Sequence, residues 1–436
     1  MTQLLSTPVL SRGPTGVFYG WWVAITLMLA TLIVYGMGAY GFALFVAPLS
    51  DEFHWSGAIA GALVAAFWFA SPLTLAGAVF IQRFGVRRLA ILGCVLVGVC
   101  FLLLPTAHQT WQFFCLRAVM GFGKILIAVC PGVALNRWFS RQYAIALALS
   151  MSGFHLGGLV TAPVTEYLID KMGWRAAATV LGVFLLVTMI PLCAFVLRIE
   201  TPQMLGLGKD GATASAAGSS RVEAREAGPV STFTAALANA MRVPALWLLA
   251  VLTLCYYTAY NGLMGLMTLY LRDLGFSLKD AAQALSLTAG CALVGLLSIG
   301  FIMKAIGLPR SLFMVLLLFF AGVVGFTCLE SARDGLLLLI SVVLFGLGIG
   351  CCDILQISFA QRRTTESDFG HIYCVWYGLS LLGFMLGPSA VGALSTASGG
   401  YHLPFVGLCF LSGVVFVLGL VLVFTGRSGG AHERSG

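Results

Sequence analysis

Four ionisable side chains, Arg117, Lys124, His155 and Asp353, lie inside long hydrophobic stretches of the sequence. A charge at the centre of a lipid bilayer costs roughly 2.5–3.5 kcal/mol even on a lenient insertion scale, so such a residue needs a partner or a wet cavity. Two fixed cations could bind an organic anion. A carboxyl or imidazole group nearby could take up and release a proton. These four residues are therefore candidates for anion binding and proton transfer.

Three of these residues also have simpler interpretations. Arg117 could extend its long side chain toward the outer membrane interface. Asp353 could pair with Arg362 or Arg363, which follow about two helical turns later. His155 could be a neutral histidine that only packs against its neighbours.

The composition indicates what kind of scaffold must position these residues. Of the 436 residues, 60% are hydrophobic and only 9% are charged, whereas a soluble domain has about 25% charged residues. This excludes an ordinary cytosolic enzyme, a nucleic-acid binder and a disordered chain. The net charge of +8 is explained by Lys and Arg in cytoplasmic loops. The 12 cysteines show no metal-ligand spacing, so we expect neither a metal nor another cofactor.

Twelve hydrophobic stretches are long enough to cross a bilayer as helices, which takes about 20 residues each. The sequence therefore predicts an all-α integral membrane protein with twelve transmembrane helices in two six-helix bundles. The stretches are 17–46, 57–81, 89–105, 112–135, 143–169, 174–197, 245–271, 281–303, 311–329, 336–360, 371–396 and 403–424.

The distribution of Lys and Arg predicts the orientation. Of the 24 such residues, 17 lie in one set of loops and tails, five lie in the opposite set, and two lie inside a helix. Because cytoplasmic loops are enriched in positive charge, we expect both termini and the central loop to be cytoplasmic. A multi-pass protein of the cytoplasmic, or inner, membrane is the predicted localisation.

The chain divides at a change of composition. Residues 200–243 are small, polar and charged, and they predict a flexible cytoplasmic linker. An N-terminal six-helix bundle would occupy residues 1–199. A C-terminal bundle with a short cytoplasmic tail would occupy residues 244–436.

The two halves resemble each other in sequence. Residues 78–88 correspond to residues 300–310 at an offset of 222, and residues 158–163 correspond to 383–388 at an offset of 225. Repeated halves of this kind are a transporter architecture, with the substrate site near the midplane between them. Gly153 and Gly157 lie four residues apart on one helix face, and so do Gly383 and Gly387. This spacing predicts close packing of helices.

The loop after the second stretch carries a resemblance to a known family. Residues 82–88, QRFGVRR, resemble the signature loop G-x-x-x-D-R-x-G-x-R-R of the major facilitator superfamily. Here Ala78 replaces the first Gly and Gln82 replaces the Asp, which in that family helps to lock the halves together on the cytoplasmic side. The resemblance implies a gating role, while the simpler alternative is that the arginines anchor the helix ends. The gating residues would be Arg83, Gly85, Arg87 and Arg88.

Two further motifs narrow the resemblance. Residues 117–123 look like a second superfamily motif, R-x-x-x-G-x-G. Residues 138–157 resemble the start of the fifth helix in monocarboxylate porters, and residues 18–22 are similar to bacterial members of that group, including the oxalate/formate-exchanger branch. Those porters usually carry a substrate-binding Arg in the eighth helix, and some carry a Lys in the first. Both are absent here, and the positive charge lies in the fourth helix instead.

The resemblance implies a central cavity lined by the first, fourth, seventh and tenth helices. On these helices the substrate-binding candidates are Lys124, Arg117, Tyr35, Asn261 and Tyr257. The proton-coupling candidates are Asp353 and His155.

A helix rise of 1.5 Å per residue places Lys124 about 16 Å and Asp353 about 10 Å from the predicted cytoplasmic face. At mid-depth the side chain of Lys124 cannot easily reach either surface. If their helices face each other, Lys124 and Asp353 could pair when no substrate is bound. An arriving carboxylate would then release Asp353 to take up a proton.

The sequence therefore predicts a secondary transporter that takes up a small organic anion together with protons. An exchanger or exporter of the same superfamily is the alternative, suggested by residues 383–388, which resemble an antiporter motif. An intramembrane enzyme is disfavoured because no HExxH or GxSxG motif is present. We expect the partners to be the anion, protons and the lipid bilayer, with no nucleic acid, and we expect a monomer.

Overall fold

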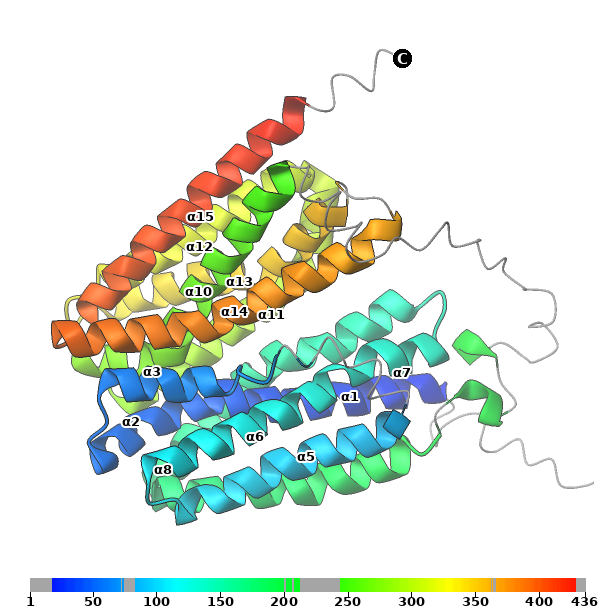
Figure 1. Cartoon of the computed structure of the whole chain (residues 1–436), viewed down its shortest axis with the longest axis horizontal. Helices are drawn as coiled ribbons and strands as arrows, with labels where there is room; N and C mark the ends of the chain where they lie inside the picture. The colour runs from blue at the N-terminus through cyan, green and yellow to red at the C-terminus, as the bar shows by residue number, and fades with distance from the viewer. Residues whose placement is uncertain are drawn as a thin grey trace, which may run out of the picture.

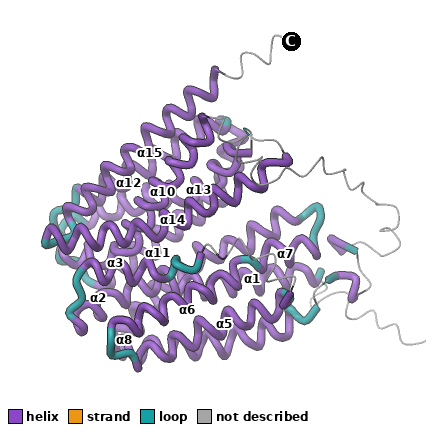
Figure 2. The backbone as a smooth tube through the Cα atoms, viewed as in Figure 1, coloured by secondary structure: helices purple, strands orange, loops and turns teal. Residues whose placement is uncertain are grey.

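The computed structural model describes residues 18–71, 73, 83–199, 201–205, 208–211, 244–361, 363 and 366–428. In this part of the chain the regular elements are helices, and no β-sheet is formed (Figure 2). Helices satisfy every backbone hydrogen bond within one segment, which is what a bilayer interior requires. The all-helical prediction is therefore confirmed.

The helices follow one another along the chain, with the longest interval between α8 and α10. In chain order they are α1 (Tyr19–Tyr35), the π-helix η1 (Gly36–Gly41), α2 (Phe42–Phe53), α3 (Gly57–Ala66), α5 (Val86–Leu103), α6 (Thr110–Ala128), α7 (Cys130–Trp138), α8 (Tyr143–Val196), α10 (Pro244–Asp273), α11 (Leu278–Ile306), α12 (Leu308–Thr327), α13 (Gly335–Gln361), α14 (Glu366–Ser398) and α15 (His402–Ser428).

Ten spans in the described residues are long and apolar enough to cross a membrane. One of them lies within α8, which is interrupted at Gly173, where φ is 77° and ψ is 162°. This break divides α8 into the fifth and sixth predicted segments. The second predicted segment begins with the shorter helix α3, and its residues 72 and 74–81 lie outside the described part. Each of the twelve predicted segments thus contains a helix.

The helices form two groups (Figure 1). Helices α1 to α8, coloured blue to green, lie together in one half of the molecule, and α10 to α15, coloured green to red, lie in the other. Most of the predicted linker, residues 200–243, lies outside the described residues.

Glycine conformations repeat between the two halves. Gly85 precedes α5 with φ 78°, and Gly307 precedes α12 with φ 83°. Gly173 and Gly399, with φ 77° and 75°, end the fifth and eleventh spans. Positive φ is readily adopted only by glycine. The same turn therefore recurs after intervals of 222 and 226 residues, which supports the repeat found in the sequence.

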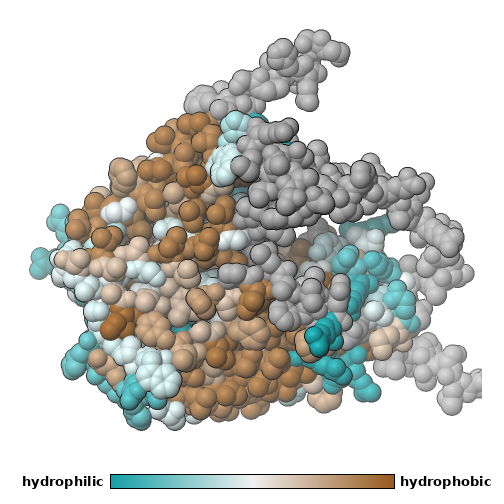
Figure 3. All heavy atoms as spheres, viewed as in Figure 1, coloured by the Kyte–Doolittle hydropathy of each residue, from teal (hydrophilic) through white to brown (hydrophobic). Residues whose placement is uncertain are grey.

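The face of the molecule seen in Figure 3 is largely apolar between its two ends. Phe301, Phe410 and Phe195 are each more than three-quarters exposed, on helices α11, α15 and α8. A soluble monomer rarely exposes such continuous apolar surface, so this band faces lipid.

The two halves touch near one end of the molecule. We call the end with residues 54–56 and 274–277 the closed end, and the opposite end, with residues 139–142 and 208–211, the linker end. At the closed end Arg272 of α10 pairs with Asp51 of α2 at 2.6 Å. The amide of Ala58 donates to Thr396 Oγ1 at 2.8 Å. Toward the linker end the helices of the two halves diverge (Figure 1).

The paired glycines of the sequence motifs pack within each half. A side chain on Gly153 or Gly157 would overlap backbone atoms of α1. A side chain on Gly383 or Gly387 would overlap atoms of α10 in the same way. These motifs therefore hold each bundle together, whereas Gly57 and Gly61 meet α14 across the halves, at Ser395 and Pro388.

Candidate functional site

Lys124 lies in α6 with only 2% of its side chain exposed. Its Nζ donates a hydrogen bond of 2.9 Å to Oγ of Ser71, in the chain that follows α3. The same Nζ lies 3.8 Å from the ring centroid of Trp68 and 4.9 Å from that of Phe67. Tyr35 of α1 is more distant, with its ring centroid 6.0 Å away. The ammonium group is therefore covered by ring faces, which attract cations.

No carboxylate in the described residues lies within ion-pair distance of Lys124 or Arg117. A hydroxyl group and aromatic faces compensate an ammonium ion only in part, because removing an ion from water costs several kcal/mol. The predicted pairing of Lys124 with Asp353 is not present in this conformation, in which each residue has a different partner.

Arg117 is buried on the same helix and is bound by backbone carbonyls. Its Nη1 donates to the carbonyl oxygen of Gly38 at 2.8 Å, and its Nε donates to that of Leu63 at 3.3 Å. The guanidinium carbon lies 3.7 Å from the ring centroid of Phe42. Gly38 belongs to η1, and a π-helical turn changes which carbonyls are bonded within the helix. Arg117 therefore ties α6 to η1 and α3, and it does not extend to the outer interface.

Asp353 is on α13, in the other half. Its Oδ1 accepts a hydrogen bond from the hydroxyl group of Tyr257 on α10. Its side chain is exposed although it lies within a membrane span. Arg363 stacks on Phe359, with 5.3 Å from its guanidinium carbon to the ring centroid, and does not pair with Asp353. Arg362 lies outside the described residues.

A buried hydrogen-bond network lies one helical turn from Asp353. Oε1 of Gln356 accepts from Thr253 Oγ1 at 2.7 Å and from Trp376 Nε1 at 3.0 Å. These contacts join α13 to α10 and α14, so they fix the rotation of α13 about its axis. The network thereby determines that Asp353 is directed to Tyr257.

His155 is buried on α8 and makes an edge-to-face contact with Phe154, with ring centroids 5.0 Å apart. Its Nδ1 has no hydrogen-bond partner among the residues that the structure describes. Because Phe154 lines the central pocket, His155 lies beside that pocket.

Residues from both halves line a narrow central pocket that is partly open to solvent. Trp68 and Phe384 close it from opposite halves, with stacked rings whose centroids are 4.2 Å apart. Nδ2 of Asn261 donates to the carbonyl oxygen of Phe384 at 2.5 Å. The lining residues are Ala39, Tyr40, Val64, Trp68, Arg117, Phe154, Tyr260, Asn261, Met264, Gly265, Leu285 and Phe384.

The predicted site residues lie either in the pocket wall or on one of its two sides. Arg117 and Asn261 line the pocket itself. Lys124 lies behind Trp68 with Tyr35 nearby, and Asp353 lies beyond Phe384, whose ring is 5.0 Å from that of Tyr257. One continuous series of contacts therefore leads from Lys124 through Trp68, Phe384 and Tyr257 to Asp353.

Sequence reasoning did not identify Trp68, Phe384 or Tyr40. An aromatic residue in an apolar stretch is equally suited to a lipid-facing surface, a packed core or a pocket wall, so hydropathy carries no signal for it. Ser71 was missed for a related reason, because a single hydroxyl is common in transmembrane helices.

The predicted gating residues lie at the linker end. Arg83 and Arg88 are exposed, Arg87 is partly exposed, and Gly85 forms the positive-φ turn before α5. The guanidinium carbon of Arg83 lies 5.7 Å from the ring centroid of Phe84. None of the three arginines has an ion-pair partner in the part of the chain that the structure describes. Ala78 and Gln82 lie outside that part.

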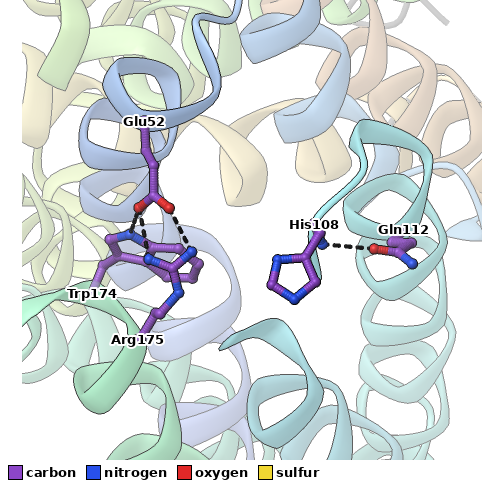
Figure 4. A network of polar contacts seen from close by, with 5 residues as sticks. All are labelled: Glu52, His108, Gln112, Trp174 and Arg175. Carbon is purple, nitrogen blue, oxygen red and sulfur yellow. Dashed lines mark hydrogen bonds and ion pairs between the residues drawn. The ribbon is translucent and has the colours of Figure 1, made fainter. Parts of the chain in front are cut away.

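A second polar cluster lies at the closed end (Figure 4). The carboxylate of Glu52 receives two hydrogen bonds from Arg175, at 2.5 and 2.9 Å, and one from Trp174 Nε1 at 2.7 Å. These contacts fix the end of α2 to the sixth span within one half. The neighbouring Asp51 instead binds Arg272 in the other half.

Comparison with known proteins gives a consistent result. The family model described as Major Facilitator Superfamily matches residues 27–379. Monocarboxylate transporter 13 of Bos taurus is 26% identical over 403 residues, covering 89% of this chain and 85% of that protein. Probable anion transporter 3, chloroplastic, of Arabidopsis thaliana is 30% identical over 132 residues, covering 29% of this chain and 26% of that protein.

Solved structures share the fold at low identity. An inward-facing, unoccupied bacterial homologue of the human lysosomal transporter Spinster superposes with a TM-score of 0.72 at 14% identity, covering 93% of this chain and 97% of that one. The nucleoside transporter NupG gives a TM-score of 0.70 at 10% identity, covering 92% and 99%.

Proposed function

The chain belongs to the major facilitator superfamily, and from this premise we propose that it moves a small organic anion, a carboxylate, across the cytoplasmic membrane by alternating access. The proposed direction is uptake coupled to protons. The names of the similar proteins, a monocarboxylate transporter and an anion transporter, support this substrate class.

The burial of Lys124 is the observation that carries the proposal. A lysine at mid-membrane, held by one hydroxyl group and ring faces, is a cation whose charge is not balanced by the described residues. A substrate carboxylate would supply the missing charge, and a charge-assisted contact in a site with little water is strong. Arg117 contributes by holding the helices around the pocket, because both of its hydrogen bonds go to backbone carbonyls.

Asp353 is the proposed proton carrier. Its side chain is exposed within a membrane span, and its carboxylate accepts a hydrogen bond from a tyrosine hydroxyl rather than pairing with a cation of the described residues. In this conformation it is linked to Lys124 only through the aromatic contacts. Direct pairing of the two would therefore belong to another step of the transport cycle. His155 is the second candidate, since its imidazole is buried and its Nδ1 has no partner.

Reconstitution tests the proposal directly. The full chain in proteoliposomes should accumulate a labelled carboxylate when an inward-directed proton gradient is imposed, and should only equilibrate it without the gradient. Lys124→Ala should abolish this uptake. The matched control is Lys304→Ala, which removes an exposed lysine at the end of α11. Equal uptake by Lys124→Ala and Lys304→Ala would contradict the assignment.

Exchange is the second candidate, supported by the antiporter-like residues 383–388. In the structure Gly383 and Gly387 pack against α10, so the motif also has a structural purpose in this chain. Exchange and uptake are separated by preloading the vesicles: an obligate exchanger needs internal substrate, whereas a proton-coupled importer works with empty vesicles and a pH gradient.

A further inference from the structure

The walls of the central pocket are mostly aromatic and aliphatic. Five rings from both halves line it, and Val64, Met264 and Leu285 complete the apolar surface. The five rings belong to Tyr40, Trp68, Phe154, Tyr260 and Phe384. A pocket with these walls gains affinity from the apolar surface of its ligand, while a few polar groups fix the orientation.

Most polar groups in the pocket wall are already bound within the protein. The guanidinium group of Arg117 donates to two backbone carbonyls, and Nδ2 of Asn261 donates to the carbonyl oxygen of Phe384. The hydroxyl groups of Tyr40 and Tyr260 differ from these, because they face only each other across the pocket wall. Two facing hydroxyl groups retain further hydrogen-bonding capacity, so a polar group on a bound molecule can bond to them at this point.

The Trp68–Phe384 stack has a particular geometry. The two rings lie 14° from parallel, and they come from opposite halves of the protein. When the halves separate during alternating access, each ring loses the flat ring that covers it. A planar apolar group on the substrate would cover both exposed faces, whereas a short acid would leave them in contact with water.

We infer that the transported anion is a carboxylate with a planar aromatic body rather than a short-chain acid. This inference rests on the proposed function, since it takes the substrate to be a carboxylate and Lys124 to be its cation. The ring packs on Trp68 and Phe384, and the hydroxyl group of Tyr40 bonds a polar atom of the ligand. The carboxylate meets Lys124 once the Trp68 ring, which covers the ammonium group in this conformation, has moved aside.

The expected preference follows from the buried area. A phenyl group that removes about 100 Å² of apolar surface from water is worth roughly 60-fold in affinity at the usual transfer coefficient. Incomplete burial reduces this gain, so at least about tenfold should be observed.

A matched panel of acids tests the inference. The purified full chain in lipid nanodiscs is titrated with benzoate, phenylacetate, cyclohexanecarboxylate, acetate and lactate, and binding is followed by the thermal unfolding midpoint. We expect benzoate and phenylacetate to half-saturate at concentrations at least tenfold below those of acetate and lactate, with cyclohexanecarboxylate between them. Acetate or lactate binding as tightly as benzoate would overturn the inference and leave the proposed function intact. Absence of binding by every acid would instead count against the proposed function itself.

Variants locate the effect in the pocket. Phe384→Leu should weaken benzoate binding about tenfold and change acetate binding little, and Phe384→Met is the second variant if Phe384→Leu does not fold. The control is Phe320→Leu, which alters an aromatic stack with Phe416 outside the pocket. Tyr40→Phe should weaken binding of a hydroxylated benzoate more than that of benzoate. Equal loss of benzoate and acetate binding in the Phe384 variants would refute the stacking role.

Discussion

Two neighbouring acids at the closed end have opposite roles in the proposed transport cycle. Asp51 pairs with Arg272 across the two halves, whereas Glu52 binds Arg175 and Trp174 within one half. Opening the closed end must break the first contact and can preserve the second. Asp51→Asn should therefore shift the balance toward the state that is open at this end, and Glu52→Gln should not.

The size of the shift follows from the exposure of the pair. The side chains of Arg272 and Asp51 are 41% and 66% exposed, so solvent screens their attraction. Exposed ion pairs contribute about 0.2–1 kcal/mol, which corresponds to a shift of about 1.4- to 5-fold in the conformational equilibrium. The effect should decrease as ionic strength rises, because the Debye length falls to about 3 Å at 1 M salt.

A cysteine at Ser395 provides the measurement. Ser395 is buried on α14, where it faces Gly57 of the other half, so it is reached only when the closed end opens. The rate of its reaction with an impermeant thiol reagent reports the open fraction, after subtraction of the rate for the parent protein. Asp51→Asn and Arg272→Gln should each raise this rate by up to about 5-fold at low salt. The double variant should add little, because both changes remove the same interaction.

Glu52→Gln is the matched control. It removes one charge from the adjacent position, so its effect on the overall field is similar. It should lower the thermal stability of the N-terminal half and leave the Ser395→Cys reaction rate unchanged. If Glu52→Gln raises that rate as much as Asp51→Asn does, the distinction between a contact across the halves and a contact within one half is wrong.

Four further outcomes are expected. Lys124→Ala should weaken substrate binding by at least about 2 kcal/mol, roughly 30-fold, and Lys124→Arg should restore only part of it because a planar fork differs from a point charge; unchanged affinity in an equilibrium titration would refute the assignment. Asp353→Asn should still exchange substrate across proteoliposomes but fail to accumulate it under a pH gradient, and normal accumulation would make His155 the next residue to test. Arg117→Gln should lower the thermal unfolding midpoint, since two backbone carbonyls lose a charged donor at about 1–3 kcal/mol each; an unchanged midpoint would show that those carbonyls find other donors. A cysteine placed at position 219, outside the described residues, should resist an impermeant reagent in intact cells and react after lysis, and labelling in intact cells would reverse the predicted orientation.

The spans were predictable from the sequence for a simple physical reason. A helix that crosses a bilayer needs about 20 apolar residues, and few other structures impose that length and composition. The repeated motifs predicted that Gly85 and Gly307 occupy corresponding positions, and both adopt a positive φ. The π-helix Gly36–Gly41 was not predicted, because a change from α to π hydrogen bonding leaves the hydropathy pattern unaltered.

The sequence indicated the charged residues of the candidate site and three polar or aromatic residues near them, Tyr35, Tyr257 and Asn261, but not the rest of its aromatic wall. Lys124 and Asp353 are conspicuous because a charge within an apolar stretch needs a reason. Their partners are inconspicuous, because Ser71 and Trp68 are ordinary residues for a membrane helix. Depth along the helix predicts how far Lys124 and Asp353 lie from the cytoplasmic face but not their contacts, since depth says nothing about helix rotation or about the conformation of the two halves.

The same reasoning explains why Arg117 and Lys124, seven residues apart on one helix, differ in role. Both are buried, and both lack a carboxylate partner among the described residues. Arg117 has five donors in a rigid fork, and two of its nitrogens are bound by the carbonyls of Gly38 and Leu63. Lys124 has three donors, of which Ser71 accepts one, so its charge is balanced less completely. The residue whose charge the protein leaves less balanced is the better candidate for a substrate contact, and this places the proposed anion site at Lys124 with Arg117 as its structural support.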